Sequence, residues 1–355
     1  MGTKVFDVVI IGGGQAALAV GYFLKKAKLD FIILDNQGRS GGAWLHTWDS
    51  LRLFSPAAYS SLPGIVMQQD DDTKDYPHRN NVLAYLARYE QHYALPVYRP
   101  HQVNSVTREE DNNCLRVSDG KYQWRARTVA SATGTWSHPY VPDYPGQAKY
   151  RGKQLHSADY RTPDDFRDQR VLVVGGGNSG AQIFAEVAEV ADATWVTQSE
   201  PVFLPDEVDG RVLFERATAR LRGDAEGAAV GGIGDIVMVP PVKAARDRGI
   251  LDSQRPFASF TETGVKWPDG SAESIDAVIW CTGFRPALDH LEPLGVIEEN
   301  GQVQVTAGQA DKEPRLWLFG YGDWASPGSA TLIGAARSAK EITPKLVRYL
   351  EDLAG

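Results

Sequence analysis

The chain has 355 residues, of which 43% are hydrophobic and 23% charged, which is ordinary for a globular protein of two or three domains. A formal net charge of −8 argues against nucleic acid or an anionic membrane as a partner, and no apolar run is long enough to span a bilayer. The two cysteines, Cys114 and Cys281, form neither a CxxC pair nor a disulfide framework, which favours a cytoplasmic protein.

Strand-like and helix-like segments predict two βαβ units, one at the start of the chain and one embedded well inside it. The predicted elements, in chain order, are a strand over 8–11, a helix over 15–28, strands over 31–34 and 171–174, a helix over 181–190, strands over 193–197 and 277–280, and an amphipathic helix over 338–353. A Gly- and Ala-rich segment over 219–235 is expected to be a loop. This order predicts an α/β fold with two Rossmann-like dinucleotide-binding domains.

The first unit carries a G-x-G-x-x-A pattern between its strand and its helix, at Gly12, Gly14 and Ala17. Gly12 permits the tight turn, and Gly14 has no side chain to keep a pyrophosphate from the helix N-terminus. About 20 residues beyond Gly14, Asp35 ends the second strand, where an acid binds the adenosine ribose hydroxyls. A tight turn without a ligand is the alternative, but strand, helix and acid together favour a dinucleotide site.

The second unit repeats the pattern as Gly175, Gly177 and Gly180, again between a strand and a helix. Two such units in one chain favour an enzyme that moves electrons between two dinucleotides, one a tightly held flavin and the other a transient nicotinamide. The segment Gly177-Asn178-Ser179-Gly180 lacks the G-x-S-x-G spacing, which argues against a serine hydrolase.

Further motifs resemble those of the class B flavin-containing monooxygenases, in a short bacterial form. Gly41-Gly42-Ala43-Trp44 is similar to the family's GGxW motif. Tyr150-x-Gly152-x-x-x-His156-x-x-x-Tyr160 is similar to its identifying sequence FxGxxxHxxxY, with Tyr in place of the first Phe. Tyr160 separates the chain from the related Baeyer–Villiger group, which carries Trp at that position.

The resemblance extends over nearly the whole chain. Ala132-Thr133-Gly134 and Cys281-Thr282-Gly283-Phe284 resemble the two ATG-type segments where the chain crosses between domains. Gly322-Asp323 resembles the GD that contacts the ribityl chain of the flavin. The resemblance implies a discontinuous FAD domain, 1–162 and 284–355, with a nicotinamide domain, 163–283, inserted into it.

The activity that the resemblance implies is a flavin-dependent monooxygenase that uses FAD, NAD(P)H and dioxygen. NAD(P)H reduces the flavin, whose C4a-hydroperoxide then passes oxygen to a small thioether, an amine or a ketone. The residues themselves leave two alternatives open, an NAD(P)H oxidase or reductase of another acceptor, and a redox sensor that uses its nucleotides as signals. Base rates favour a homodimer.

Phe54, His156 and Tyr160 are expected at the reacting centre on this resemblance. Family members commonly carry Asn beside the flavin C4a position, near where Phe54 stands here, which predicts a leak of hydrogen peroxide. The further expected cofactor contacts are Gln15, Ala16, Leu53, Val103, Asn178, Ser179 and Leu332. The histidines show no ligand spacing, so no metal site is expected.

The nicotinamide preference is predicted from the end of the second strand of the inserted unit, at Gln198 and Ser199. Strict NADPH enzymes of the family place Arg and then Thr there, and the Arg binds the 2′-phosphate. A neutral pair favours neither a hydroxyl nor a phosphate, so both NADH and NADPH are expected to serve. The alternative is that an Arg or Lys distant in sequence supplies the missing charge.

Overall fold

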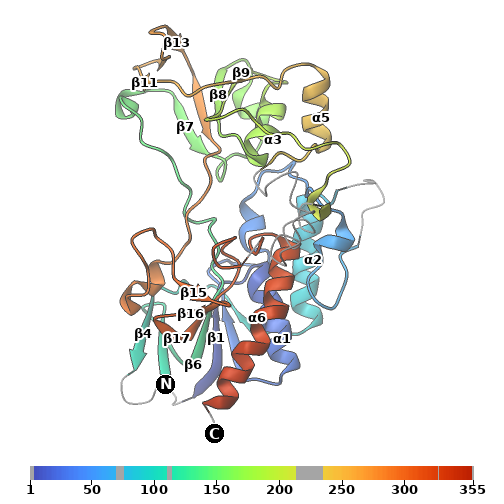
Figure 1. The fold of residues 1–355 in the computed structure, drawn as a ribbon, viewed down its shortest axis with the longest axis vertical. Coiled ribbons are helices and arrows are strands. Elements are labelled where there is room, and N and C mark those ends of the chain that lie inside the picture. Colours follow the sequence, from blue (N-terminus) through green and yellow to red (C-terminus); the bar gives the residue numbers. More distant parts are fainter. Residues whose placement is uncertain (1–3, 69–75, 110–113, 213–234, 327, 354–355) are drawn as a thin grey trace. The chain divides into compact units, whose positions relative to one another are not determined.

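The computed structural model describes residues 4–68, 76–109, 114–212, 235–326 and 328–353. They form two compact units (Figure 1). Unit 1 comprises Met1–Leu45, Ser55–His138 and Arg285–Gly355, and unit 2 comprises His46–Phe54 and Pro139–Phe284. Apart from residue 235, the loop expected over 219–235 lies outside the described residues.

Unit 1 is built on a sheet with the strand order β15-β16-β17-β6-β1-β2-β3, to which β4 and β5 are joined through β6. The strands are β1 (Val5–Ile11), β2 (Phe31–Leu34), β3 (Val97–Tyr98), β4 (Ser105–Glu109), β5 (Cys114–Ser118), β6 (Gln123–Ser131), β15 (Val305–Thr306), β16 (Gln309–Ala310) and β17 (Glu313–Leu318). Because β3, β2, β1, β6 and β17 pair in parallel, their carboxyl ends share one edge of the sheet.

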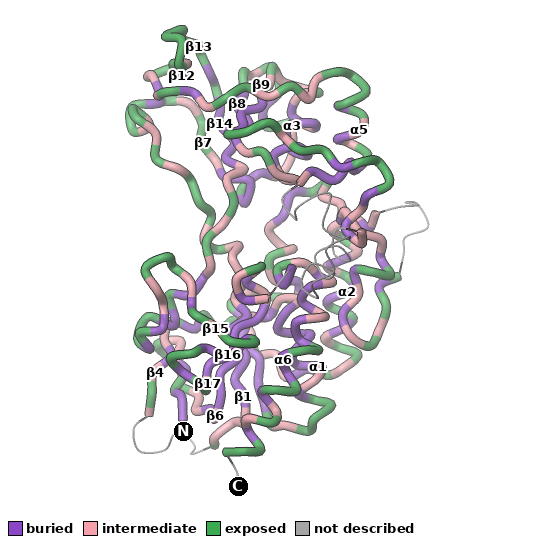
Figure 2. Tube along the Cα trace, viewed as in Figure 1, coloured by how far each residue is buried: buried purple, intermediate pink, exposed green. Residues whose placement is uncertain are grey.

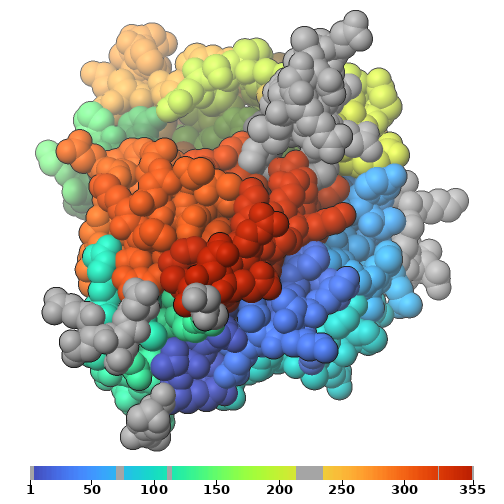
Figure 3. Space-filling model, turned by 60° about the horizontal axis from the view of Figure 1, so that its bottom comes forward, coloured from blue at the N-terminus to red at the C-terminus, as the bar shows by residue number. Residues whose placement is uncertain are grey.

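Three helices belong to unit 1: α1 (Gln15–Lys26), α2 (Arg79–His92) and α6 (Leu332–Asp352). Helix α1 packs against α6, so the red C-terminal helix lies beside the blue N-terminal segment in Figure 3. Helix α6 begins at Leu332 rather than at 338, because the Thr331 hydroxyl caps it by accepting the Gly334 N–H at 3.1 Å. The apolar spacing predicted only its later turns.

Unit 2 contains a fully parallel sheet with the strand order β10-β9-β8-β14-β7. Its strands are β7 (Lys153–His156), β8 (Arg170–Val174), β9 (Asp192–Val196), β10 (Ser253–Gln254) and β14 (Ala277–Trp280), and its helices are α3 (Asn178–Val187) and α5 (Pro240–Asp247). A small antiparallel sheet joins β11 (Ser259–Phe260), β12 (Gly264–Lys266) and β13 (Ala272–Ser274). The inner strands β8 and β14 are buried (Figure 2).

Short 3₁₀ helices cover Gly42–His46, Ala57–Ser60, Gln147–Lys149, Pro163–Phe166 and Asp289–Leu294. Among the helices that the structure describes, none is both long enough and apolar enough to cross a bilayer.

The α/β fold with two Rossmann-like units, the second inserted into the first, is confirmed. The long segment of unit 2 runs from Pro139 to Phe284, whereas the sequence prediction placed the inserted domain over 163–283. The reason is β7, which pairs with β14 with His156 opposite Trp280 and so draws the FxGxxxHxxxY-like motif into unit 2. Segment 46–54 also belongs to unit 2.

A buried polar network lies at the carboxyl edge of the unit 1 sheet. Ser131, at the end of β6, is 2.9 Å from Nε2 of His290 and 2.5 Å from the hydroxyl of Tyr321. The Tyr321 hydroxyl also lies 2.7 Å from the hydroxyl of Thr133. Burial lowers the pKa of His290 from 6.5 to about 4, so the ring is neutral at pH 7.

This burial predicts a loss of stability in mild acid. Between pH 6.5 and about 4 the unfolded chain binds a proton at His290 that the folded chain does not bind, so the free energy of unfolding falls as the pH falls through this window. The expected loss is up to ~3 kcal/mol. Urea unfolding from pH 7 to pH 4 should show it, and His290→Asn should flatten the slope. An unchanged slope in this variant would contradict the assignment.

Candidate active site

The first glycine of each nucleotide-binding turn lies against a backbone carbonyl. A Cβ on Gly12, whose φ is +104°, would lie 2.4 Å from the carbonyl oxygen of Ala132. A Cβ on Gly175, whose φ is +138°, would lie 2.2 Å from that of Cys281. The two turns are therefore built alike, each against the crossover segment that follows the neighbouring parallel strand, and neither tolerates a side chain.

The helix that follows each turn offers free N–H groups to an anion. Helix α1 has Gly14 as its N-cap and α3 has Gly177, and neither N-cap makes a side-chain hydrogen bond. Neither helix carries an acidic residue in its first turn. The unpaired N–H groups and the positive end of the helix dipole fit a pyrophosphate at both places. The expected contacts Gln15, Ala16, Ser179 and Gly180 lie in these first turns.

The side chain of Asn178 is occupied within unit 2. Its amide nitrogen donates to the carbonyl of Asp235 at 2.9 Å, and its amide oxygen accepts the N–H of Val237 at 2.9 Å. These bonds tie the start of α3 to the segment that leads into α5. Only the backbone of Asn178 remains for the predicted phosphate contact.

Asp35 ends β2 beside the first glycine turn, as the sequence predicts. Its side chain is only 2% exposed, and its carboxylate accepts a hydrogen bond from Nε of Arg99 at 2.6 Å. Arg99 also makes a bidentate pair with Glu90, at 2.6 and 2.8 Å. The sequence did not reveal Arg99, because it stands 64 positions from Asp35 and no motif marks it.

The GGxW-like segment joins the same edge of unit 1. The indole N–H of Trp44 donates to the amide oxygen of Gln15 at 2.9 Å, and the amide nitrogen of Gln15 donates to the carbonyl of Ala330 at 2.8 Å. Ala330 lies just before Leu332, the first residue of α6. The structure thus brings Gln15, Gly42, Trp44 and Leu332 to one place.

The crossover and GD-like segments are ordered by their own hydrogen bonds. The Thr133 hydroxyl donates to the carbonyl of Ala287 at 2.6 Å, and the Thr282 hydroxyl donates to the carbonyl of Tyr140. Asp323 accepts the N–H of Gly328 at 2.7 Å. Val103 is buried in the core that includes residues of β2 and β6. Gly134 and Gly283 both have positive φ.

His156 and Tyr160 are both buried in unit 2. Nδ1 of His156 accepts the N–H of Ala158 at 3.1 Å, its ring packs edge-on against Phe284 at 4.8 Å, and burial lowers its pKa. The Tyr160 hydroxyl donates to Glu186 at 3.1 Å, and burial raises its pKa. A neutral imidazole and a phenol at pH 7 suit positioning better than proton transfer.

Leu53 and Phe54 cluster with unit 2, whereas most of the other expected flavin contacts lie in unit 1. Leu53 is buried and Phe54 is partly buried. The Phe54 carbonyl accepts the N–H of Gly210 at 2.6 Å. Their place beside the flavin stays a prediction.

A cation that the sequence prediction left unassigned lies where the adenosine end of the second site is expected. Gln198 and Ser199 are exposed just beyond the carboxyl end of β9. Arg255 follows β10, and its Nη1 donates to the carbonyl and hydroxyl of Thr197 at 3.1 and 2.6 Å. Its Nη2 donates to Glu200. Because β10 pairs in parallel with β9, the carboxyl ends of both strands lie at the same edge of the sheet. Recognising this pairing in the sequence would have placed Arg255 beside Thr197.

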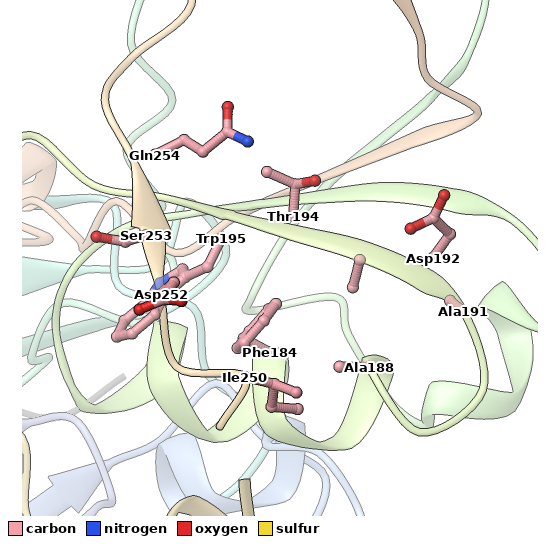
Figure 4. A pocket seen from close by; sticks show the side chains of 11 residues that line it. Phe184, Ala188, Ala191, Asp192, Thr194, Trp195, Ile250, Asp252, Ser253 and Gln254 are labelled. Atoms are coloured by element: carbon pink, nitrogen blue, oxygen red, sulfur yellow. The ribbon is translucent and has the colours of Figure 1, made fainter. Parts of the chain in front are cut away.

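A separate pocket of about 380 Å³ lies along β9 (Figure 4). Phe184 of α3 and Ala188, which follows α3, line it together with Ile250 and the acidic side chains of Asp192 and Asp252. Its lining includes neither the glycine turn nor Thr197, and its two carboxylates repel phosphate, so we do not assign a nucleotide to it.

Comparison with known proteins identifies the family. The family model described as pyridine nucleotide-disulphide oxidoreductase matches residues 9–211. A flavin-containing monooxygenase from Stenotrophomonas maltophilia is 51% identical, with a TM-score of 0.89 over 98% of this chain and 99% of that chain. An uncharacterized oxidoreductase, CzcO, of Bacillus velezensis is 31% identical over 96% of this chain and 99% of its own length.

A plant relative extends the comparison. The rice indole-3-pyruvate monooxygenase YUCCA4 is 28% identical over 99% of this chain and 90% of its own length. Together with the two dinucleotide-binding turns, these likenesses establish that the chain belongs to the flavin-containing monooxygenase family and is a flavin-dependent oxidoreductase.

Proposed function

We propose that this protein is an NAD(P)H-dependent monooxygenase that oxygenates small soft nucleophiles, thioethers first, with FAD on unit 1 and the nicotinamide cofactor on unit 2. The observation that carries the proposal is the pair of matching turns, each open to a pyrophosphate, in a chain of this family. Amines and ketones are further substrate classes. An oxidase, a reductase of another acceptor or a redox sensor remains the alternative.

Bound FAD would supply the chemistry, since a flavin accepts hydride from NAD(P)H and activates dioxygen. One oxygen atom goes to the substrate sulfur and the other leaves as water, with both electrons supplied by NAD(P)H. The protein residues bind the cofactors and the substrate, orient them and exclude water. His156 and His290 are buried rings with lowered pKa values, so neither is poised as a general base at pH 7.

The cysteines support oxygenation over disulfide reduction. Cys114 is buried in a strand of unit 1, and Cys281 belongs to unit 2. Burial raises the pKa of the Cys281 thiol, which disfavours the thiolate that a dithiol mechanism needs. Neither cysteine has another cysteine three positions away, as a CxxC pair requires.

Oxygenation of a thioether is the test of this proposal. Under ¹⁸O₂, purified protein with NAD(P)H should convert an aryl alkyl thioether into a sulfoxide that carries ¹⁸O. Because Phe54 stands where relatives commonly have Asn, we expect hydrogen peroxide in a large share of turnovers, with the share falling when thioether is added. NAD(P)H consumption that gives only peroxide, or an unlabelled sulfoxide, would favour the oxidase alternative.

Asp35 should govern the retention of FAD. Asp35→Ala removes charge-assisted hydrogen bonds to the ribose, each ~1.5–3 kcal/mol, so the Kd for FAD should rise about ten- to a hundredfold for each bond lost. Asp35→Asn should be milder. The measurement is flavin fluorescence on titration of apoprotein, with the exposed Asp30→Asn as control. If the Asp35→Ala variant binds FAD as tightly as the wild type, Asp35 does not contribute to the FAD site.

The contacts around Thr197 support the use of both nicotinamides. Arg255 offers a cation for a 2′-phosphate, whereas Glu200 offers an acceptor for a 2′-hydroxyl and repels phosphate. The two side chains pair with each other, and both are exposed, at 43% and 84%. Neither charge dominates while they are paired, so the discrimination between NADH and NADPH is small.

Breaking this pair should move the cofactor preference in either direction. Arg255→Gln should lower the NADPH-to-NADH ratio of kcat/KM by about ten- to a hundredfold, and Glu200→Gln should raise it. Gln198→Arg with Ser199→Thr should also shift preference toward NADPH, and the exposed Glu207→Gln serves as control. A wild type that prefers NADPH by about a thousandfold would refute the balanced site.

A further inference from the structure

Segment 46–54 belongs to a different unit from the residues on either side of it in the sequence. The chain before it, to Leu45, and after it, from Ser55, belongs to unit 1, but the segment itself clusters with unit 2. Two backbone hydrogen bonds hold the segment there, one near its middle and one at its last residue. The N–H of Asp49 donates to the carbonyl of Arg161 at 3.2 Å, and the carbonyl of Phe54 accepts the N–H of Gly210 at 2.6 Å.

Two aromatic side chains bury the middle and the end of this segment in unit 2. Trp48 is 4% exposed and packs edge-on against the fully buried Tyr160, with ring centroids 6.3 Å apart. A Cβ on Gly210 would lie 2.6 Å from the Phe54 ring, so the phenyl group rests directly on the backbone of unit 2.

Glu186 of α3 joins the segment to the identifying motif. One carboxylate oxygen accepts a hydrogen bond from the Ser50 hydroxyl, and the other accepts one from the Tyr160 hydroxyl at 3.1 Å. Among the residues that the structure describes, Glu186 has no ion-pair partner, and the charge that contributes to its pKa shift is the carboxylate of Glu189. Burial raises its pKa, with Glu189 contributing and the two hydroxyl bonds opposing. A partly buried acid without a cation is not retained for ion-pair stability.

We propose that Glu186 is a positioning residue that holds segment 46–54 on unit 2 through Ser50 and Tyr160, and thereby fixes the place of Leu53 and Phe54 on that unit. The inference rests on the proposed function for the role expected of Phe54. It gives Tyr160 a defined task, which is to complete the carboxylate bridge while its ring supports Trp48.

Hydrogen–deuterium exchange tests the bridge without relying on activity. Glu186→Ala and Ser50→Ala should each speed exchange in the peptide that contains 46–54 by about ten- to a hundredfold. Glu186→Gln keeps a carbonyl oxygen and an N–H for the two hydroxyls and should restore protection. Glu189→Ala, a neighbouring exposed acid, is the matched control. Unchanged exchange in the Glu186→Ala and Ser50→Ala variants would overturn the proposal.

The peroxide yield per NAD(P)H tests the positioning role. Glu186→Ala should raise the peroxide share at saturating thioether, Glu186→Gln should return it to the wild-type value, and Ser50→Ala should add little to Glu186→Ala because both remove one bridge. Faster exchange with an unchanged peroxide share would overturn this role. If the wild type oxygenates no thioether, the proposed function fails. Hydrogen–deuterium exchange then still tests whether Glu186 holds the segment. The absorption spectrum of the bound flavin tests the positioning role.

Discussion

The carbonyl oxygen of Ala132 occupies the space where a side chain on Gly12 would lie, and that of Cys281 does the same at Gly175. This close contact follows from strand order, since β6 adjoins β1 and β14 adjoins β8 in parallel register. The crossover after each neighbouring strand therefore presses on the glycine turn. Each following helix begins at a glycine N-cap that makes no side-chain hydrogen bond, and the groups expected to hold the nucleotides are arranged around these two points.

Around each turn the protein places paired charges and neutral buried rings rather than a set of general acids and bases. Arg99 bonds to Asp35 in unit 1, and Arg255 bonds to Glu200 in unit 2. His290 is neutral because it is buried. Such groups orient a cofactor and shield it from water, which suits a reaction whose difficult chemistry belongs to a flavin.

Segment 46–54 belongs to a different unit from the chain on either side of it. It follows the GGxW-like segment of unit 1 but packs on unit 2 through Trp48 and Ser50. Phe54 is therefore held by contacts within unit 2, through its carbonyl and its ring against Gly210.

Local sequence by itself determined the two βαβ units, their glycine turns and the acid at the end of β2, because each depends on residues close together in the chain and on the small size of glycine. The family motifs also located Trp44 and Tyr160. Only the tertiary structure decided the partners of these residues and the boundary at residue 139. Arg99 stands 64 positions from Asp35, Arg255 stands 58 from Thr197, and Glu186 stands 136 from Ser50. The first two pairs arise where neighbouring parallel strands end at one edge, and the third arises where segment 46–54 packs on α3. No local pattern of side chains records these neighbours.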